Sequence, residues 1–124
     1  MLISTIEPRN LRDVRDRALV TVVYDTMCRR EELVSLRVED IAEAGDGSGS
    51  ILIRRLKTDA TGEGAAVYLS PMTLRFLKGW LSQAGIREES IFRRVAGDKA
   101  VGSPLTPQVV ATIFRKVNAA GTAI

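Results

Sequence analysis

Apolar residues recur at spacings of three and four along "NLRDVRDRALVTVVYDTM", with charged residues between them. This is the period of a helix that buries one face, so it predicts an amphipathic helix from about residue 10 to residue 27, with Asn10 as its N-cap. A second, short helix is expected from about residue 30 to residue 36, burying Leu33 and Leu36. The chain should then extend through "RVEDI", and the glycines of "EAGDGSGS" predict a loop.

Two β-prone runs, "SILIRRLK" and "AAVYLS", lie on either side of the polar segment "TDATGEG". Together they predict an antiparallel hairpin, with Lys57 at the exit of its first strand. Helical patterns lie before and after this hairpin. We therefore expect an α+β fold, mainly helical, in which helices surround a small antiparallel hairpin or sheet.

Each of the two later helices is predicted to begin with a hydroxyl residue followed by proline, a combination that favours an N-cap and a first helical residue. In "SPMTLRFLKGWLSQAG" these residues are Ser70 and Pro71, and Gly85 ends the helix. The buried stripe of this helix is predicted to be Met72, Phe76, Trp80 and Leu81. In "LTPQVVATIFRKVNAAG" the last helix begins at Thr106 and Pro107. Its buried face is predicted to be Val109, Val110, Ile113, Phe114 and Val117, and its polar face Gln108, Thr112, Arg115 and Lys116.

Length and composition limit the class of protein. The 124 residues, 45% of them apolar, are enough for one small domain or part of one. No apolar run approaches the roughly 18 residues of a membrane span, and the N-terminus does not have the order of a signal peptide, so no membrane partner and a cytoplasmic location are expected. With Cys28 as the single cysteine and no histidine, the chain cannot form an internal disulfide, and neither a metal site nor a cofactor is expected.

Charge is distributed unevenly along the chain. Residues 1–50 hold 7 Lys and Arg against 10 Asp and Glu, whereas residues 51–124 hold 11 against 5, so the two parts carry net charges of −3 and +6. A polyanion would therefore meet the second part of the chain. The pattern suggests nucleic acid as a partner, and an ordinary solvated surface is the alternative.

Four stretches follow one another over nearly the whole chain: "YDTMCRREELVSLRVEDI", "ILIRRLKTD", "VYLSPMTLRFLKGWL" and "PLTPQVVATIFRKVNAAG". In this order they resemble the catalytic domain of the tyrosine recombinase (phage integrase) family. The first stretch is the most specific, because arginine followed by x-x-Glu-Leu and then Leu-x-x-x-Asp-Ile marks that family well. The lysine hairpin alone would be a weak signal.

The resemblance implies a chemistry. Members of the family cut DNA without a metal, through a tyrosine that attacks the scissile phosphate and leaves a 3′-phosphotyrosine and a free 5′-hydroxyl. By this resemblance Arg29 is the first catalytic arginine, Glu32 is an acidic residue placed to orient it, and Lys57 is the general acid that protonates the departing 5′-oxygen, with Lys99 as a weaker candidate. A guanidinium suits phosphate because it stays ionised and donates two parallel hydrogen bonds.

Further residues are candidate contacts to double-stranded DNA. Thr106 and Gln108 lie on the first turn of the last helix, where the family places backbone and base-edge contacts, and Gln108 could pair with an adenine edge. Arg30, Arg54 and Arg115 are candidate backbone contacts. The plainer alternatives are that Thr106 is only a cap, that residues 29–32 are a solvated helix start, and that Lys57 only improves solubility.

The parts of the family pattern that hold the His-x-x-Arg region and the nucleophilic tyrosine have no match here, and neither Tyr24 nor Tyr68 occupies the place of the nucleophile. We therefore expect residues 1–124 to be the first part of a catalytic domain, without the N-terminal DNA-clamping domain, and inactive in cleavage on their own. Two other interpretations stay open: a stand-alone DNA-binding or regulatory module derived from this fold, and an unrelated protein-interaction domain.

Two expectations about surfaces follow. Arg29 and Lys57 should face one shared, solvent-open basic surface. Self-association is also expected, through the first helix or through the apolar face from Val109 to Val117, because a partial domain leaves apolar surface uncovered.

Overall fold

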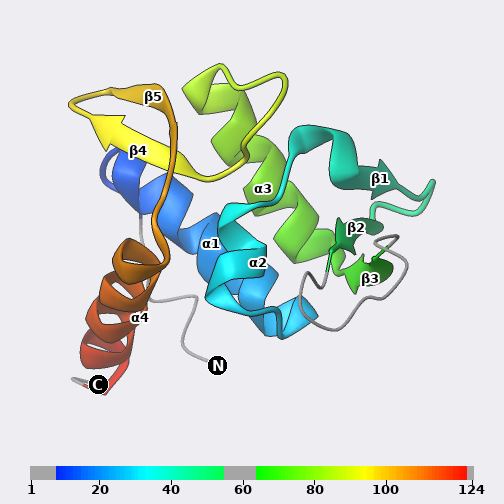
Figure 1. Ribbon diagram of the computed structural model, residues 1–124, viewed down its shortest axis with the longest axis horizontal. Coiled ribbons are helices and arrows are strands. Elements are labelled where there is room, and N and C mark those ends of the chain that lie inside the picture. The colour runs from blue at the N-terminus through cyan, green and yellow to red at the C-terminus, as the bar shows by residue number, and fades with distance from the viewer. Residues whose placement is uncertain (1–7, 55–63, 123–124) are drawn as a thin grey trace.

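The computed structural model describes residues 8–54 and 64–122, which form four α-helices and two small antiparallel sheets (Figure 1). In chain order the elements are α1 (Leu11–Thr26), α2 (Arg30–Val34), the 3₁₀ turn η2 (Val38–Asp40), β1 (Ile41–Glu43), β2 (Gly49–Ile53), β3 (Ala65–Leu69), α3 (Pro71–Ala84), β4 (Arg93–Ala96), β5 (Lys99–Pro104) and α4 (Pro107–Thr122). The predicted α+β class, with helices around a small antiparallel sheet, is confirmed.

α1 and α3 lie side by side at the centre of the molecule, and both ends of each helix follow from local chemistry (Figure 1). The Asn10 side chain accepts a hydrogen bond from the Asp13 N–H at 2.9 Å, and the Ser70 hydroxyl accepts one from the Thr73 N–H at 3.2 Å. Gly85 ends α3 in the left-handed conformation, with φ of 68°. The predicted caps are therefore confirmed, and the helices begin and end within a residue or two of the predicted positions.

The stripe predicted for α3 is partly right, since all four residues contact the core. Trp80 is fully buried and donates its indole N–H to the Ile91 carbonyl at 2.8 Å, but Met72, Phe76 and Leu81 are only half-buried. The other buried residues of this helix are Thr73, Leu74 and Leu77. α1 packs along α3, and its Arg17 guanidinium lies over the ring of the half-buried Phe76.

β2 and β3 pair antiparallel, with Gly49 opposite Leu69 and Ile53 opposite Ala65, as the hairpin prediction requires. β1 adds a third strand that was not predicted. The expected extended segment "RVEDI" is wrong in its first part, because the Asp40 carboxylate accepts a hydrogen bond from the Arg37 N–H at 3.1 Å and closes the turn η2. Only from Ile41 onward is the chain a strand.

The β4–β5 hairpin was also not predicted. It packs against the N-terminal half of α1, where Arg12 and Arg15 donate hydrogen bonds to the carbonyls of Val95 and Arg93 at 3.4 and 3.3 Å. Short strands rich in Arg, Lys and Gly carry little β propensity, so only contacts across the fold identify them.

α4 follows β5 and contacts α2. Thr106 caps it by accepting a hydrogen bond from the Val109 N–H at 3.3 Å. Val110 and Ile113 are buried and Val109 is exposed, so the predicted apolar face is right except at its first residue. Among residues 8–54 and 64–122, none of the helices combines the length and apolar character needed to cross a membrane.

Candidate nucleic-acid interface

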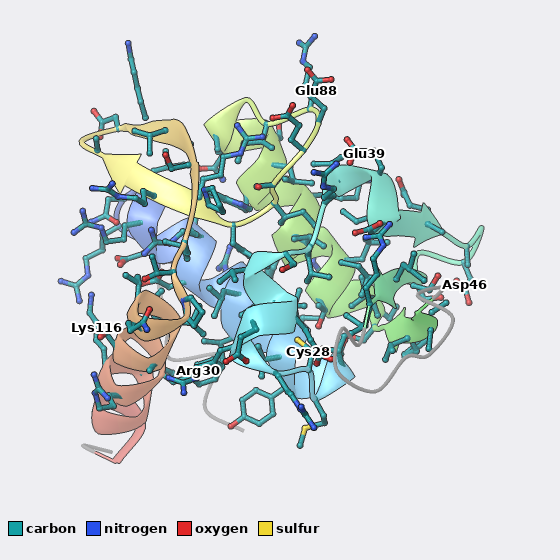
Figure 2. All side chains as sticks on the ribbon, viewed as in Figure 1. Cys28, Arg30, Glu39, Asp46, Glu88 and Lys116 are labelled. Atoms are coloured by element: carbon teal, nitrogen blue, oxygen red, sulfur yellow. The ribbon has the colours of Figure 1, made fainter. Side chains whose placement is uncertain are left out.

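Arg29 lies at the junction of α1 and α2, where the chain changes direction. α1 ends at Met27 in the left-handed conformation, and Cys28 is buried beneath the junction. Arg29 itself has an extended backbone, with φ of −78° and ψ of 160°, and is the N-cap of α2. Its side chain is exposed, and so is that of Arg30, which Figure 2 labels.

Glu32 holds the backbone of this junction. Its carboxylate is buried and accepts a hydrogen bond from the Arg29 N–H at 2.7 Å, the acceptor half of a capping box. Within the described part of the chain, no hydrogen bond or ion pair engages the guanidinium of Arg29 or Arg30. Glu32 thus fixes the main chain at Arg29 without contacting its guanidinium in any hydrogen bond between described residues.

Arg54 forms an ion pair with an acidic residue, and the sequence did not predict this partner. Its guanidinium donates to the Asp40 carboxylate at 2.9 Å, and Asp40 is almost completely buried whereas 43% of the Arg54 side chain is exposed. A DNA contact by Arg54 stays a prediction. Lys57 lies outside the described residues, and so does the predicted surface that it would share with Arg29.

α4 presents polar side chains near its start. Thr106, Gln108 and Arg115 are exposed, and the Arg115 guanidinium donates to the Thr112 hydroxyl at 3.2 Å. Because α4 contacts α2, these residues belong to the element next to the one that carries Arg30 (Figure 1). Their proposed DNA contacts stay predictions. Lys99 is an exposed residue at the start of β5.

A second feature lies where α1, the β4–β5 hairpin and α4 meet. It is an open cavity of about 360 Å³, with Arg12, Arg94, Val95, Leu105, Val109 and Lys116 among its lining residues. At its base the buried Arg15 guanidinium pairs with the Asp16 carboxylate at 2.8 Å. Burial raises the pKa of Asp16 above its ordinary value, and attraction to Arg15 opposes that shift without cancelling it.

None of the described residues forms a group of three or more side chains suited to hold a metal ion. The two tyrosines are both exposed, Tyr24 in the last turn of α1 and Tyr68 on β3 opposite Ser50. The chemistry available at the α1–α2 junction is therefore the binding of an anion by guanidinium groups, in a position set by the Glu32 cap.

The fold and the arginine junction agree with one family of proteins. The sequence model of the Phage integrase family matches residues 1–123, and the chain belongs to this family. The resemblance inferred from the four sequence stretches is thereby confirmed.

Particular relatives make the comparison more specific. Recombinase cre of Escherichia phage P1 is 28% identical over 101 residues, which are 79% of this chain and 29% of that protein. The integrase/recombinase xerD homolog of Selenomonas ruminantium is 30% identical over 123 residues, which are 94% of this chain and 36% of that protein. The chain thus spans about a third of the length of these curated relatives.

A solved structure supports the fold. The XerH site-specific recombinase, bound to its difH substrate in a pre-cleavage complex, superposes with a TM-score of 0.72 at 24% identity. The match covers 96% of this chain and 33% of XerH. At this level of identity the likeness establishes the shared fold of this part of the recombinase.

Proposed function

We propose that residues 1–124 form the first part of the catalytic domain of a site-specific DNA recombinase and bind duplex DNA in the cytoplasm. The observation that carries this proposal is the pair of exposed guanidinium groups at the α1–α2 junction, which no side chain of the described residues neutralises. The family match and the likeness to recombinase cre and to the DNA-bound XerH structure support it.

In this proposal Arg29 binds the non-bridging oxygens of the phosphate at which a strand is exchanged. A guanidinium remains ionised at all physiological pH values and donates two parallel hydrogen bonds, so it stabilises the negative charge that builds on those oxygens during attack. Glu32 positions Arg29 through its N–H, and Lys57 protonates the leaving 5′-oxygen. Arg30, Arg54 and Arg115 neutralise neighbouring phosphates, and Thr106 and Gln108 meet the DNA at the start of α4.

The test is a titration of a short mixed-sequence duplex, followed by fluorescence anisotropy at two salt concentrations. Arg29→Ala should weaken binding about tenfold and reduce the salt dependence by about one released ion, because one charge-assisted phosphate contact is lost. Arg87→Ala is the matched control. It removes the same charge beside Glu88, which lies at the opposite end of the molecule from Arg30 (Figure 2). Equal losses in the two variants, or no binding at low salt, would refute the proposal.

Cleavage is tested separately with duplex DNA that carries a phosphorothiolate at the scissile position. We expect no covalent adduct, since neither Tyr24 nor Tyr68 occupies the position of the family's nucleophile in the sequence order. A covalent band on a denaturing gel would contradict this expectation.

We also propose that copies of residues 1–124 associate. Val109 is exposed at the start of α4, beside a cavity with apolar lining residues. A second copy that covers this surface would remove apolar area from water. Light scattering should show a mass that rises with concentration, and Val109→Asp should suppress the rise. A concentration-independent monomer would exclude this mode of association.

A further inference from the structure

Met27 occupies a backbone position that does not favour methionine. It closes α1 in the left-handed region, with φ of 54° and ψ of 30°, where a side chain beyond glycine is strained. α3 ends with the same left-handed cap, and there the residue is Gly85. The same turn is therefore made twice in this molecule, once by the residue that suits it and once by a residue that does not.

Burial does not compensate for this strain. Met27 is 78% exposed, more than any other large apolar residue among the described ones. Tyr24, three residues earlier in the last turn of α1, is 50% exposed. A single exposed apolar residue is ordinary, but two neighbours that include a strained one are not explained by folding.

The position of Met27 relative to Arg29 points to a ligand. Consecutive Cα atoms are 3.8 Å apart, so the Cα atoms of Met27 and Arg29 are separated by no more than about 7.6 Å. An apolar strip, Tyr24 and Met27, thus adjoins the cationic pair Arg29 and Arg30. A nucleic-acid backbone has the complementary pattern, because its anionic phosphates alternate with sugars that have apolar faces.

We propose that Met27, with Tyr24 beside it, packs against the deoxyribose next to the phosphate bound by Arg29. This inference rests on the proposed function and adds a DNA-contact residue that is independent of charge. Methionine suits the role, since its unbranched, polarisable thioether adapts to an irregular surface. The strain at the cap is then retained because a glycine there would lose the contact.

Met27→Gly separates this role from a structural one. Glycine relieves the left-handed strain, so the variant should unfold at the same or a higher urea concentration than the parent. Its affinity for the mixed-sequence duplex should nevertheless fall about fivefold, as expected for the loss of about one buried methylene equivalent. The salt dependence should stay unchanged, because no phosphate contact is lost. Met27→Leu, which restores an apolar side chain, should recover most of the affinity.

Oxidation provides a second readout that does not depend on a variant. Dilute peroxide converts exposed methionine to its sulfoxide, and mass spectrometry measures the rate at each site. Bound duplex should slow the oxidation of Met27, whereas the half-buried Met72 serves as the internal reference.

The outcomes distinguish the two proposals. If Arg29→Ala weakens binding but Met27→Gly does not, or if duplex leaves Met27 oxidation unchanged, the sugar contact is wrong and the DNA-binding function stands. If Met27→Gly weakens binding only to the extent that it destabilises the fold, Met27 is structural and the inference is also overturned. If neither variant affects binding, the proposed function is refuted, and the sugar contact that rests on it is refuted as well.

Discussion

The two ends of α1 use arginine in opposite ways. At the N-terminal end Arg12 and Arg15 donate to carbonyls of β4, Arg15 also pairs with Asp16, and the Arg17 guanidinium lies 4.0 Å from the centroid of the Phe76 ring. At the C-terminal end Arg29 and Arg30 are exposed and have no such partner within the described part of the chain.

This difference arises from what surrounds each group. The β4–β5 hairpin offers backbone carbonyls to Arg12 and Arg15, so these two guanidiniums hold the hairpin against α1. At the other end the buried Glu32 carboxylate bonds to a main-chain N–H, and no ion pair among residues 8–54 and 64–122 engages Arg29 or Arg30. The residue type is the same at both ends of α1. Whether an arginine stabilises the fold or is available to a ligand therefore depends on the groups that surround it.

The largest expected effect is at the structural end. Arg15→Met leaves the buried Asp16 carboxylate without its ion-pair partner, so the free energy of unfolding should fall by about 3 kcal/mol. Urea denaturation measures it, with Arg12→Ala as the control that should stay within about 0.5 kcal/mol because Arg12 is exposed. Duplex affinity per folded molecule should be unchanged. A loss of duplex affinity equal to that of Arg29→Ala would contradict the distinction between structural arginines at one end of α1 and ligand-binding arginines at the other.

A smaller effect is expected at the junction. Glu32→Ala removes the acceptor for the Arg29 N–H, which should cost about 1 kcal/mol of unfolding free energy. Duplex affinity should also fall, because the Arg29 backbone is no longer held. Glu32→Gln keeps an acceptor oxygen and should retain most of both quantities. If Glu32→Ala left both unchanged, the cap would have no part in presenting Arg29.

The smallest expected effect depends on pH. Burial raises the pKa of Asp16, so between the unfolded and folded pKa values the folded state binds more protons than the unfolded one. The Asp16 contribution to stability is therefore greatest at low pH and is lost as the pH rises from about 4 through the raised folded pKa. Asp16→Asn does not titrate. The parent should lose stability relative to this variant over that window, as urea unfolding at a series of pH values would show. A difference that grew in favour of the parent with pH would mean that attraction to Arg15 outweighs burial.

Local chain chemistry was enough to predict much of this molecule. The caps at Asn10, Ser70 and Thr106 and the left-handed stop at Gly85 depend on hydrogen bonds and backbone preferences within a few residues, so they can be read from short stretches. The same holds for the junction that carries Arg29, because its motif is contiguous. The roles of Arg29, Glu32 and Lys57 in chemistry stay predictions.

Packing decided the rest. The hydrogen bonds from Arg12 to Val95 and from Arg15 to Arg93 span 83 and 78 positions, and the pair of Arg54 with Asp40 spans 14. No period or cap in the sequence indicates such partners. The buried face of α3, the strand β1 and the β4–β5 hairpin likewise depend on which surface covers them. A side chain's neighbours within one turn are set by the covalent chain, whereas its neighbours across the core are set by how the elements pack. For this reason arginine side chains contact other elements of the fold at one end of α1 and are exposed at the other.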